Sequence, residues 1–579
     1  MKRLLALCLA ALLCILIAVL AIPRAFSGQD LNAALVETLQ SASRQTVSIE
    51  GTSRLSLLPT PRIVVSDVVA EMNGTELFRA RRAVVSFKLL PLLLGARQAD
   101  EIELERPRFT LTPDLLRWTA LHRFVTANSE LPNIFVTDGE ATVLSGRGIS
   151  DVTEINGSLG WRRPTSTVKL NGSFVWHGQA IQARFNLDDP QRVHDGEDAD
   201  LSFEAHSALG DIEFEGKLAG ATRVASGDLD LRSPSALALA HWLGAPVKAH
   251  GRLGAIALEG TAEATGDRLT VSDADLTLDG NALSGVLIWS NIGTAKFEAS
   301  LAAPMLDLTP YVTALRPMIG SALGWSRRTL HTLPESLPET EIRLSADRVS
   351  AGSLEFGNAA GSIRVRHGSL TLIVDELGTY GGSVAAHASY EPAAGGGVHA
   401  GLSARVDNVA LADVLAGVDS GAMRGALTAN LRIEGSGPDT FDLIKALSGQ
   451  ADLRIADGMV SGMDLAAAAR AARREPLTAV SVRGGTTAFT ALEGHLAVAD
   501  GIFHVENGKL SGDALTASLS GGIDLAQRHW ALSGEALLAD EADAGPVPFR
   551  IEGPFAHPHF LPNGRHAVER SDSAPSSPQ

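Results

Sequence analysis

Apolar and polar residues alternate one by one over many short stretches of the chain. Alternation of this kind gives a β-strand one apolar and one polar face. We therefore predict a mainly β body. The clearest alternating stretches are 54–57, 100–104, 108–111, 201–205, 228–231, 274–278, 369–372, 451–455 and 515–519.

Asn-Gly and Asp-Gly pairs recur between these stretches. Such pairs favour the positive backbone angles of type I′ turns, which join antiparallel strands. Strands that recur about every 8–12 residues with turn signals between them indicate antiparallel β structure. We predict hairpin turns at Asn73-Gly74, Asp138-Gly139, Asn156-Gly157, Asn171-Gly172, Asp279-Gly280, Asp457-Gly458, Asp500-Gly501 and Asn507-Gly508.

Short helical segments interrupt the strand pattern. Residues 30–39 place leucines on one helical face behind a capping Asp30. Ser233 and Pro234 resemble the cap and first turn of a helix that continues to Trp242. Further short helices are predicted at 112–126, 307–318, 438–447 and 463–473.

Changes in pattern and composition divide the chain into six parts. Residues 326–340 follow neither period, so they are interpreted as a linker between two β-rich regions. The Pro- and Ser-rich tail is expected to be disordered. The predicted parts are a stub and anchor at 1–27, an N-terminal region of helix and strands at 28–130, a first β region at 131–325, the linker at 326–340, a C-terminal β region at 341–564 and the tail at 565–579.

A single unbroken apolar run, Leu4 to Ile22, lies between Lys2-Arg3 and Arg24. Its length suits one transmembrane helix, which needs about 20 apolar residues. The positive charges at the start predict a cytoplasmic N-terminus and an exported body. A cleaved signal peptide is the alternative, although the run exceeds the usual apolar core of about 7–15 residues. The two cysteines both lie inside this run, so the exported body has no disulfide chemistry.

Charge and motifs argue against several classes of function. The formal net charge is −17, which disfavours nucleic acid because binding there depends on Lys and Arg. No catalytic constellation stands out, and we predict neither an enzyme nor a cofactor. The letters of Ser166 to Lys169 match an SxxK motif, and His557-Pro558-His559 could hold a metal through two nitrogens. Both are weak matches without the partner residues that such sites need.

Strands with one apolar face must bury that face or use it. Two stacked sheets would cover each other in a sandwich. Alternatively, an elongated and incompletely closed sheet would leave an apolar groove that could take acyl chains. Alternation by itself favours the sandwich or a repeat array and leaves both solutions open.

Two regions of the chain resemble the AsmA family of bacterial envelope proteins. Near the anchor, the similar segments are LLPTPRIVVSDV (57–68), LLPLLLG (89–95) and IELERPRF (102–109). Towards the C-terminus they are FTALEGHLAVADGI (489–502), GGIDL (521–525) and PFRIEGP (548–554). The stretch 303–311 is a possible echo in mid-chain. Residues 130–430 carry the β pattern without a motif of the family.

The resemblance implies an inner-membrane anchor, a periplasmic β-groove with a chorein-type N-terminal element, and movement of phospholipid towards the outer membrane. It brings no catalytic residues. It also implies a possible partner at the outer membrane or in its assembly machinery. The alternative is a structural or chaperone-like factor in outer-membrane protein assembly, acting through exposed strand edges. The candidate lipid-lining residues are Leu55, Leu57, Ile63, Val65, Val85, Phe87, Ile102 and Leu104.

Overall fold

The structure is a computed structural model. It describes residues 46–56, 60–72, 75–88, 99–111, 131–145, 148–162, 167–243, 253–321, 324–412, 423–462, 464–474, 484–555 and 559–562. The anchor Leu4 to Ile22, the helices expected at 30–39 and 112–126, Leu57 and the tail at 565–579 lie outside these residues. Within the described ranges, none of the helices combines the length and apolarity that a membrane span requires.

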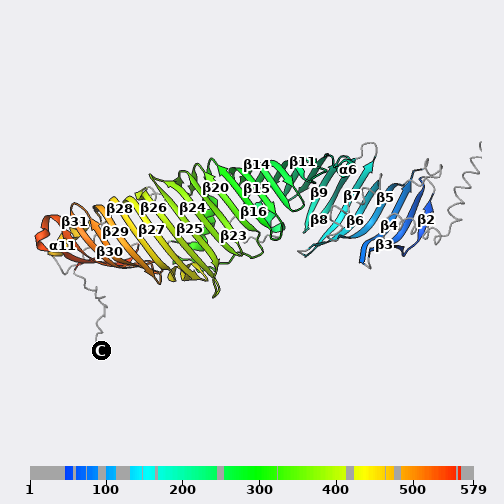
Figure 1. Cartoon of the computed structure of the whole chain (residues 1–579). Helices are drawn as coiled ribbons and strands as arrows, with labels where there is room; N and C mark the ends of the chain where they lie inside the picture. Colours follow the sequence, from blue (N-terminus) through cyan, green and yellow to red (C-terminus); the bar gives the residue numbers. More distant parts are fainter. Residues whose placement is uncertain are drawn as a thin grey trace, which may run out of the picture. The chain divides into compact units, whose positions relative to one another are not determined.

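The chain is mainly β, with few short helices and a large sheet that does not close. It divides into two compact units, and the division falls within β14 (Arg268–Leu278). Unit 1 comprises residues 1–242 and 255–274, and unit 2 comprises residues 243–254 and 275–579. Each unit is described separately below, with the strand labels of Figure 1.

Unit 1 forms one sheet in which neighbours along the chain are neighbours in space from β3 to β13. The first two strands both pair with β3. Its elements are β1 (Thr46–Ile49), β2 (Ser53–Ser56), β3 (Arg62–Met72), β4 (Thr75–Phe87), β5 (Ala99–Leu111), β6 (Leu131–Ser145), β7 (Gly148–Arg162), β8 (Thr167–Trp176), β9 (Gln179–Leu187), α6 (Pro190–His194), β10 (Ala199–Ser207), β11 (Gly210–Leu218), β12 (Ala225–Ser233), α7 (Ala236–Trp242) and β13 (Ile256–Ala264).

Unit 2 continues the same plan, with two small additional sheets, β17-β21-β22 and β18-β19. Its elements are β15 (Asn281–Ser290), β16 (Lys296–Ala303), β17 (Leu306–Asp307), α8 (Thr309–Ile319), β18 (Gly320–Ser321), β19 (Gly324–Trp325), β20 (Glu339–Ala346), β21 (Val349–Ala351), β22 (Leu354–Phe356), β23 (Ala359–Arg366), β24 (Ser369–Thr379), β25 (Gly382–Pro392), β26 (Val398–Ala410), β27 (Met423–Gly437), α10 (Thr440–Lys445), β28 (Ser448–Ser461), α11 (Leu465–Arg474), β29 (Thr486–Ala499), β30 (Ile502–Ser511), β31 (Leu515–Asp524), β32 (His529–Leu538), the 3-10 helix η1 (Ala539–Ala544), β33 (Val547–Pro554) and β34 (His559–Pro562).

Most neighbouring strands are antiparallel, as the sequence predicts, but two of the large-sheet pairs whose register the structure describes are parallel. These pairs are β5 with β6 in unit 1 and β16 with β20 in unit 2. A parallel pair cannot be joined by a hairpin. After the first strand, the chain must return to the end of the sheet where that strand began, so that the second strand can run in the same direction. Long connections therefore stand at both places, residues 112–130 and 304–338.

Five of the predicted hairpin turns are wrong. The pairs Asp138-Gly139, Asn156-Gly157, Asn171-Gly172, Asp457-Gly458 and Asn507-Gly508 lie inside strands β6, β7, β8, β28 and β30. In contrast, Asp279-Gly280 and Asp500-Gly501 do connect strands, whereas Asn73-Gly74 lies outside the described residues. Register shifts lie beside Gly139, Asn156 and Gly508, and among the five pairs Asp138 and Asp457 are the residues with positive φ. An extra residue at such a bulge adopts angles that Asp, Asn and Gly tolerate, and it bends the strand.

Side chains link the bulges of neighbouring strands in unit 1. Arg106, Asp138 and Glu154 all have positive φ within β5, β6 and β7. Arg106 donates to the Asp138 carboxylate at 2.9 Å, and the Asp138 amide donates to Asn156 Oδ1 at 2.9 Å. Bends at the same height in adjacent strands add up, so these residues curve the sheet rather than end its strands.

The helical segments that can be checked are confirmed. The structure has α7 near 233–242, α8 near 307–318, α10 near 438–447 and α11 near 463–473. Asp439 caps α10 by accepting from the Asp442 amide at 2.8 Å. In contrast, Ser233 does not cap α7: Ser235 accepts from the Ala238 amide, while the Ser233 hydroxyl donates to the Leu209 carbonyl.

The turn glycine Gly501 provides a test of the β29–β30 connection. Its φ is +73°, and a Cβ added there would lie 2.5 Å from the Ile444 carbonyl oxygen. We expect Gly501→Ala to destabilise unit 2 by about 1–3 kcal/mol through backbone strain and this contact. Gly280→Ala is the matched control, since φ is +85° and open space surrounds the added Cβ. Equal losses of thermal stability in the two variants would contradict the role given to the contact.

Candidate functional site: a continuous apolar face

One face of the unit 1 sheet carries an uninterrupted row of apolar side chains, which we call the unit 1 apolar row. Register pairs connect each member to the next from β2 to β12. The row runs across the strands rather than along one of them. Its members are Leu55, Ile63, Val85, Ile102, Ile134, Leu159, Leu170, Phe185, Phe203, Phe214 and Leu229.

The structure brings the described lining candidates together on this face. The register places Leu55, Ile63, Val85 and Ile102 in the row, with Val65 and Leu104 in the row beside it. Phe87, Leu55 and Leu104 pack against a core of Ile63, Val65, Val68 and Ala83. Of the candidates, Ile63 and Val65 are buried and the other described ones are half-buried. Contact between these side chains and lipid remains a prediction.

Unit 2 has an equivalent row, the unit 2 apolar row, which our site prediction did not include. The signal was present in the same alternation, at 369–372 and 451–455. The site prediction nevertheless stopped at the segments nearest the anchor. The members of the unit 2 apolar row are Leu287, Ala299, Ile342, Ile363, Leu372, Ala388, Leu402, Ile433, Val498, Phe503, Ile523 and Trp530, with Gly449, which has no side chain, between Ile433 and Val498.

Much of this apolar surface is accessible to solvent. Leu170 in unit 1 and Leu372 in unit 2 are each 42% exposed, and most other members are half-buried. In a sandwich, the opposite sheet would bury such positions. Among the described residues of unit 1 only one sheet is present, and those of unit 2 add only the two small sheets. The described parts of both units therefore differ from a sandwich.

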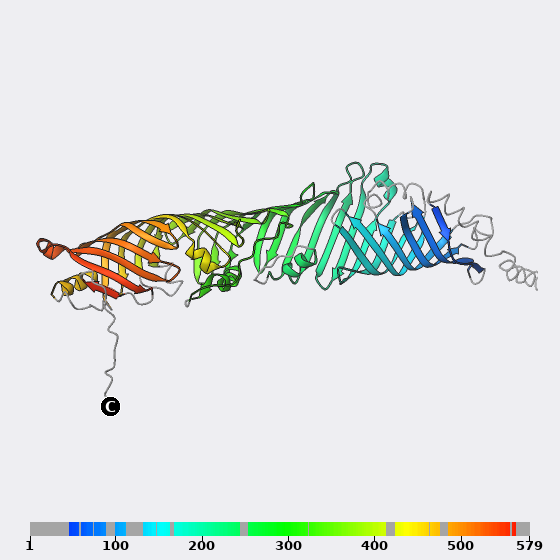
Figure 2. The same ribbon diagram turned by 90° about the horizontal axis from the view of Figure 1, so that it is seen from below.

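At the C-terminal end of unit 2, α11 covers the apolar face. Its buried residues Leu465, Ala468, Ala469 and Ala472 pack with strand residues that include Phe549. The helix contacts β29, β32 and β33. Four strand spacings span about 19 Å in a flat sheet, more than the helix diameter of about 10–12 Å. The sheet therefore bends around α11 with its apolar face inside (Figure 2).

Two ion pairs hold the exposed side of α11 against η1. Arg470 pairs with Asp540 at 2.8 Å, and Arg473 pairs with Glu541 at 2.9 Å. Arg473 also donates to the Gly545 carbonyl. Small alanines on the inner side of α11 let it lie close to the large side chains of the strands. The helix thus fixes one end of the accessible apolar surface.

The opposite face of the sheet carries cross-strand ion pairs, alongside some apolar residues such as the buried Val84. Examples are Arg82 with Glu105 and Arg454 with Glu493, both at 2.6 Å. Such exposed pairs contribute little, typically about 0–1 kcal/mol each. The hydrogen bond to Asp452 raises the pKa of His495 on this face. These groups are consistent with a solvated outer surface.

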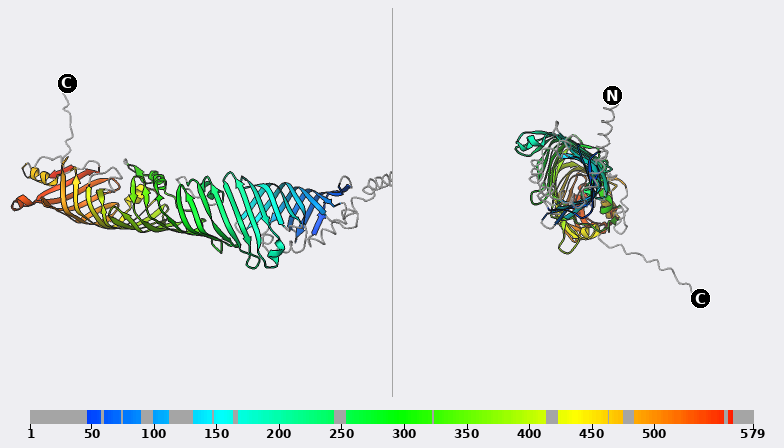
Figure 3. Two further views of the ribbon diagram at one scale, coloured as in Figure 1. Left: turned by 90° about the horizontal axis from the view of Figure 1, so that it is seen from above. Right: turned by 90° about the vertical axis from the view of Figure 1, so that its right-hand side faces the viewer.

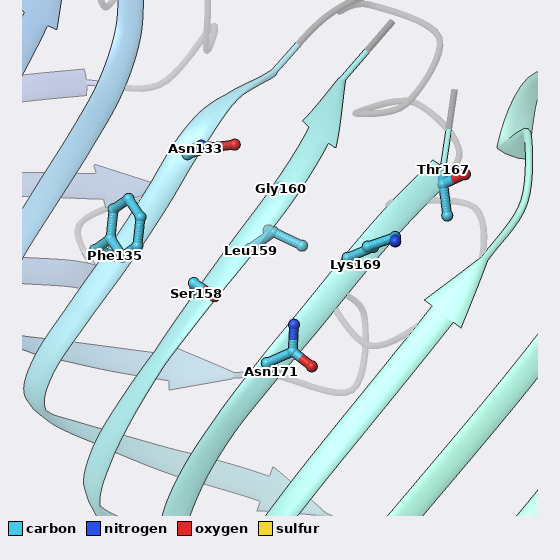
Figure 4. A pocket seen from close by; sticks show the side chains of 8 residues that line it. All are labelled: Asn133, Phe135, Ser158, Leu159, Gly160, Thr167, Lys169 and Asn171. Carbon is cyan, nitrogen blue, oxygen red and sulfur yellow. The ribbon is translucent and has the colours of Figure 1, made fainter. Parts of the chain in front are cut away.

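A small hollow of about 310 Å³ lies over β6, β7 and β8 (Figure 4). Gly160 and Ser158 in the middle strand leave room between Phe135 on one side and Lys169 and Asn171 on the other. Lys169 is the lysine of the SxxK match and lies in β8, while Ser166 lies outside the described residues.

The described part of the chain contains no cluster of three or more His, Cys, Asp or Glu residues that could hold a metal.

Comparison with known proteins gives one finding. Residues 298–508 match the sequence profile of the AsmA family. The match includes the motif at 489–502 and the stretch 303–311. The segments of resemblance near the anchor and the C-terminal segments 521–525 and 548–554 lie outside it. No curated protein and no solved structure matched the chain.

Proposed function

Starting from a chain whose residues 298–508 match the AsmA family, we propose that it handles phospholipid in the bacterial envelope. Acyl chains lie on the apolar rows of the two units, and headgroups reach water at the open edge of the sheet. The result is movement of phospholipid towards the outer membrane and support of outer-membrane biogenesis. The proposal assigns no chemical step and no cofactor to the chain.

One observation carries this proposal: the apolar rows are continuous across many strands and yet partly exposed. Exposed apolar surface of more than a few hundred Å² usually marks a binding site. At about 4.8 Å per strand, the unit 1 row from β2 to β12 extends about 48 Å. Half the hydrocarbon core of a bilayer is about 15 Å. A row of this length has room for more than one lipid.

We propose that Leu4 to Ile22 anchors the chain in the inner membrane with a cytoplasmic N-terminus. The body then lies in the periplasm. Its negative net charge of −17 favours a body held away from anionic lipid surfaces. Such a placement suits a protein that receives lipid at its anchored end and passes it along the sheet.

The test is mass spectrometry of lipids that co-purify with a soluble fragment of residues 29–565. We expect phospholipid in stoichiometric amounts, because the apolar rows would otherwise face water. A folded fragment that retains no lipid would contradict the proposal. Circular dichroism of the same sample distinguishes an empty β sheet from an unfolded chain.

The second candidate is a structural or chaperone-like factor in outer-membrane protein assembly. The observation that favours it is the edge strand β34, which pairs with β33 and with no other described strand. An open edge can recruit a strand from another protein. Crosslinks from β34 to assembly-machinery subunits, together with an absence of bound lipid, would favour this function over lipid handling.

A further inference from the structure

The connection between β16 and β20 has to cross the unit 2 sheet. These neighbours are parallel, with Lys296 opposite Glu339 and Ala303 opposite Ala346. The last residue of β16 and the first residue of β20 therefore lie at opposite ends of this strand pair. Residues 304–338 must pass from one end of the strands to the other. Helix α8 is the longest regular element of that crossing, and at 1.5 Å per residue its 11 residues span about 16 Å.

Hydrogen bonds fix the first end of α8 at the edge where β16 ends. The Tyr311 hydroxyl donates to Asp279 Oδ2 at 2.8 Å, and the Asp307 amide donates to Asn281 Oδ1 at 2.6 Å. The Leu308 amide donates to the Ser350 carbonyl at 2.7 Å. Burial, followed by the hydrogen bond to Asp279, raises the pKa of Tyr311 above its usual range. The phenol therefore stays protonated as the donor.

Other contacts fix the second end of α8 at the edge where β20 begins. The Thr440 hydroxyl, at the start of α10, donates to the Met318 carbonyl at 2.6 Å. Beyond the helix, the Trp325 indole donates to the Leu525 carbonyl at 2.7 Å. The Arg327 guanidinium lies 3.7 Å from the centre of the Phe441 ring. These contacts thus fix both ends of α8, one near each end of the β16–β20 strand pair.

The crossing passes over the apolar face. Figures 2 and 3 both place the green helix of residues 309–319 on the same side of the unit 2 sheet as the gold helix α11. Helix α11 packs against the apolar face of that sheet. Because the two helices share a side, α8 lies over the unit 2 apolar face as well.

Helix α8 itself has an exposed apolar stripe. Val312, Leu315 and Ile319 follow the i, i+3, i+7 spacing of one helical face and are 41%, 55% and 51% exposed. Arg316, four residues after Val312, borders this stripe, whereas Thr313 lies on a different side of the helix. Contact of such an apolar stripe with water is unfavourable, whereas contact with an acyl chain on the sheet below removes apolar surface from water and is favourable.

We propose that this stripe faces the unit 2 apolar row and that phospholipid acyl chains pass between α8 and the sheet. This inference rests on the proposed function and adds a specific contact to it. The occupant is an acyl chain rather than a protein, because the stripe continues an apolar surface already present below it. Helix α8 then closes the path locally.

The test uses the full-length chain in cells, with a photo-crosslinking amino acid at one position at a time. Leu315 probes the stripe, and Thr313 is the matched control, exposed on the same helix but directed elsewhere. Leu372 in the unit 2 apolar row is the reference for lipid on the sheet. After irradiation, adducts are identified by mass spectrometry. We expect phospholipid adducts when the crosslinker is at Leu315 or Leu372 and none when it is at Thr313.

The outcomes separate this inference from the proposed function. Lipid adducts at Leu372 but not at Leu315 would overturn the inference and leave the proposed function standing. An absence of lipid adducts at both positions would overturn both. Adducts to another protein at Leu315 would also overturn the inference, because the stripe would then be a docking surface. Equal lipid adducts at Leu315 and Thr313 would indicate nonspecific contact and overturn it too.

Discussion

Leu372→Asp is expected to weaken phospholipid binding in unit 2 while the sheet stays folded. Leu372 lies in the middle of the unit 2 apolar row and is 42% exposed. In the empty protein, the new carboxylate can remain hydrated. With a lipid in place it would lose water without gaining a partner, which costs several kcal/mol. Since about 1.4 kcal/mol is a factor of ten, we expect at least about a tenfold loss of lipid affinity at the unit 2 row, and a lower ratio of retained lipid to protein.

The measurement is mass spectrometry of lipid retained by the variant, with circular dichroism as the check on folding. Thr371→Asp is the matched control, because Thr371 is the adjacent residue and points to the other face of β24. It should retain lipid as the parent protein does. If both variants retain lipid equally, the apolar row does not bind acyl chains. If Leu372→Asp unfolds, the position belongs to an ordinary core.

Phe549→Ala should produce a large loss of stability. Phe549 is 2% exposed and lies in the cluster beneath α11 with Phe489, Leu515 and Leu538. Truncating a buried phenylalanine typically costs about 3–5 kcal/mol, from lost burial and from the cavity that remains. We expect local opening around α11 to increase by about a hundredfold to several thousandfold, at about 1.4 kcal/mol per factor of ten.

Hydrogen-exchange mass spectrometry of peptides from β28 to β33 measures this opening directly. The control is Phe135→Ala, because Phe135 is 36% exposed and belongs to unit 1. It should leave exchange in these peptides unchanged. Unchanged exchange in Phe549→Ala would mean that α11 contributes little to the packing of this end. An equal effect of both variants would mean a general loss of stability.

The sequence predicted the elements better than their connections. Period-two alternation requires only local geometry, and stretches such as 201–205 and 369–372 are strands in the structure. Gly and Asp preferences are also local, but they report a positive backbone angle and not its context. For that reason Asp138-Gly139 is a bulge in β6, whereas Asp500-Gly501 is a true turn.

The candidate site was predicted in part. Alternation identified which side chains share a face, so Ile63, Val85 and Ile102 fall into one row. It could not show that the row continues through β12, because register between strands depends on pairing over long sequence distances. The family match at 298–508 confirms the resemblance. The predicted domain boundaries remain predictions.

The sequence by itself determined that the body is mainly β, with one apolar face per strand, because side-chain direction alternates with every residue. Only the tertiary structure decided whether that face is covered. Helix α11 has an Ala-rich sequence that suits any close packing, yet it seals one end of the apolar face. Helix α8 crosses that face because β16 and β20 pair in parallel. Neither placement is encoded in local propensity, since both depend on which strands meet.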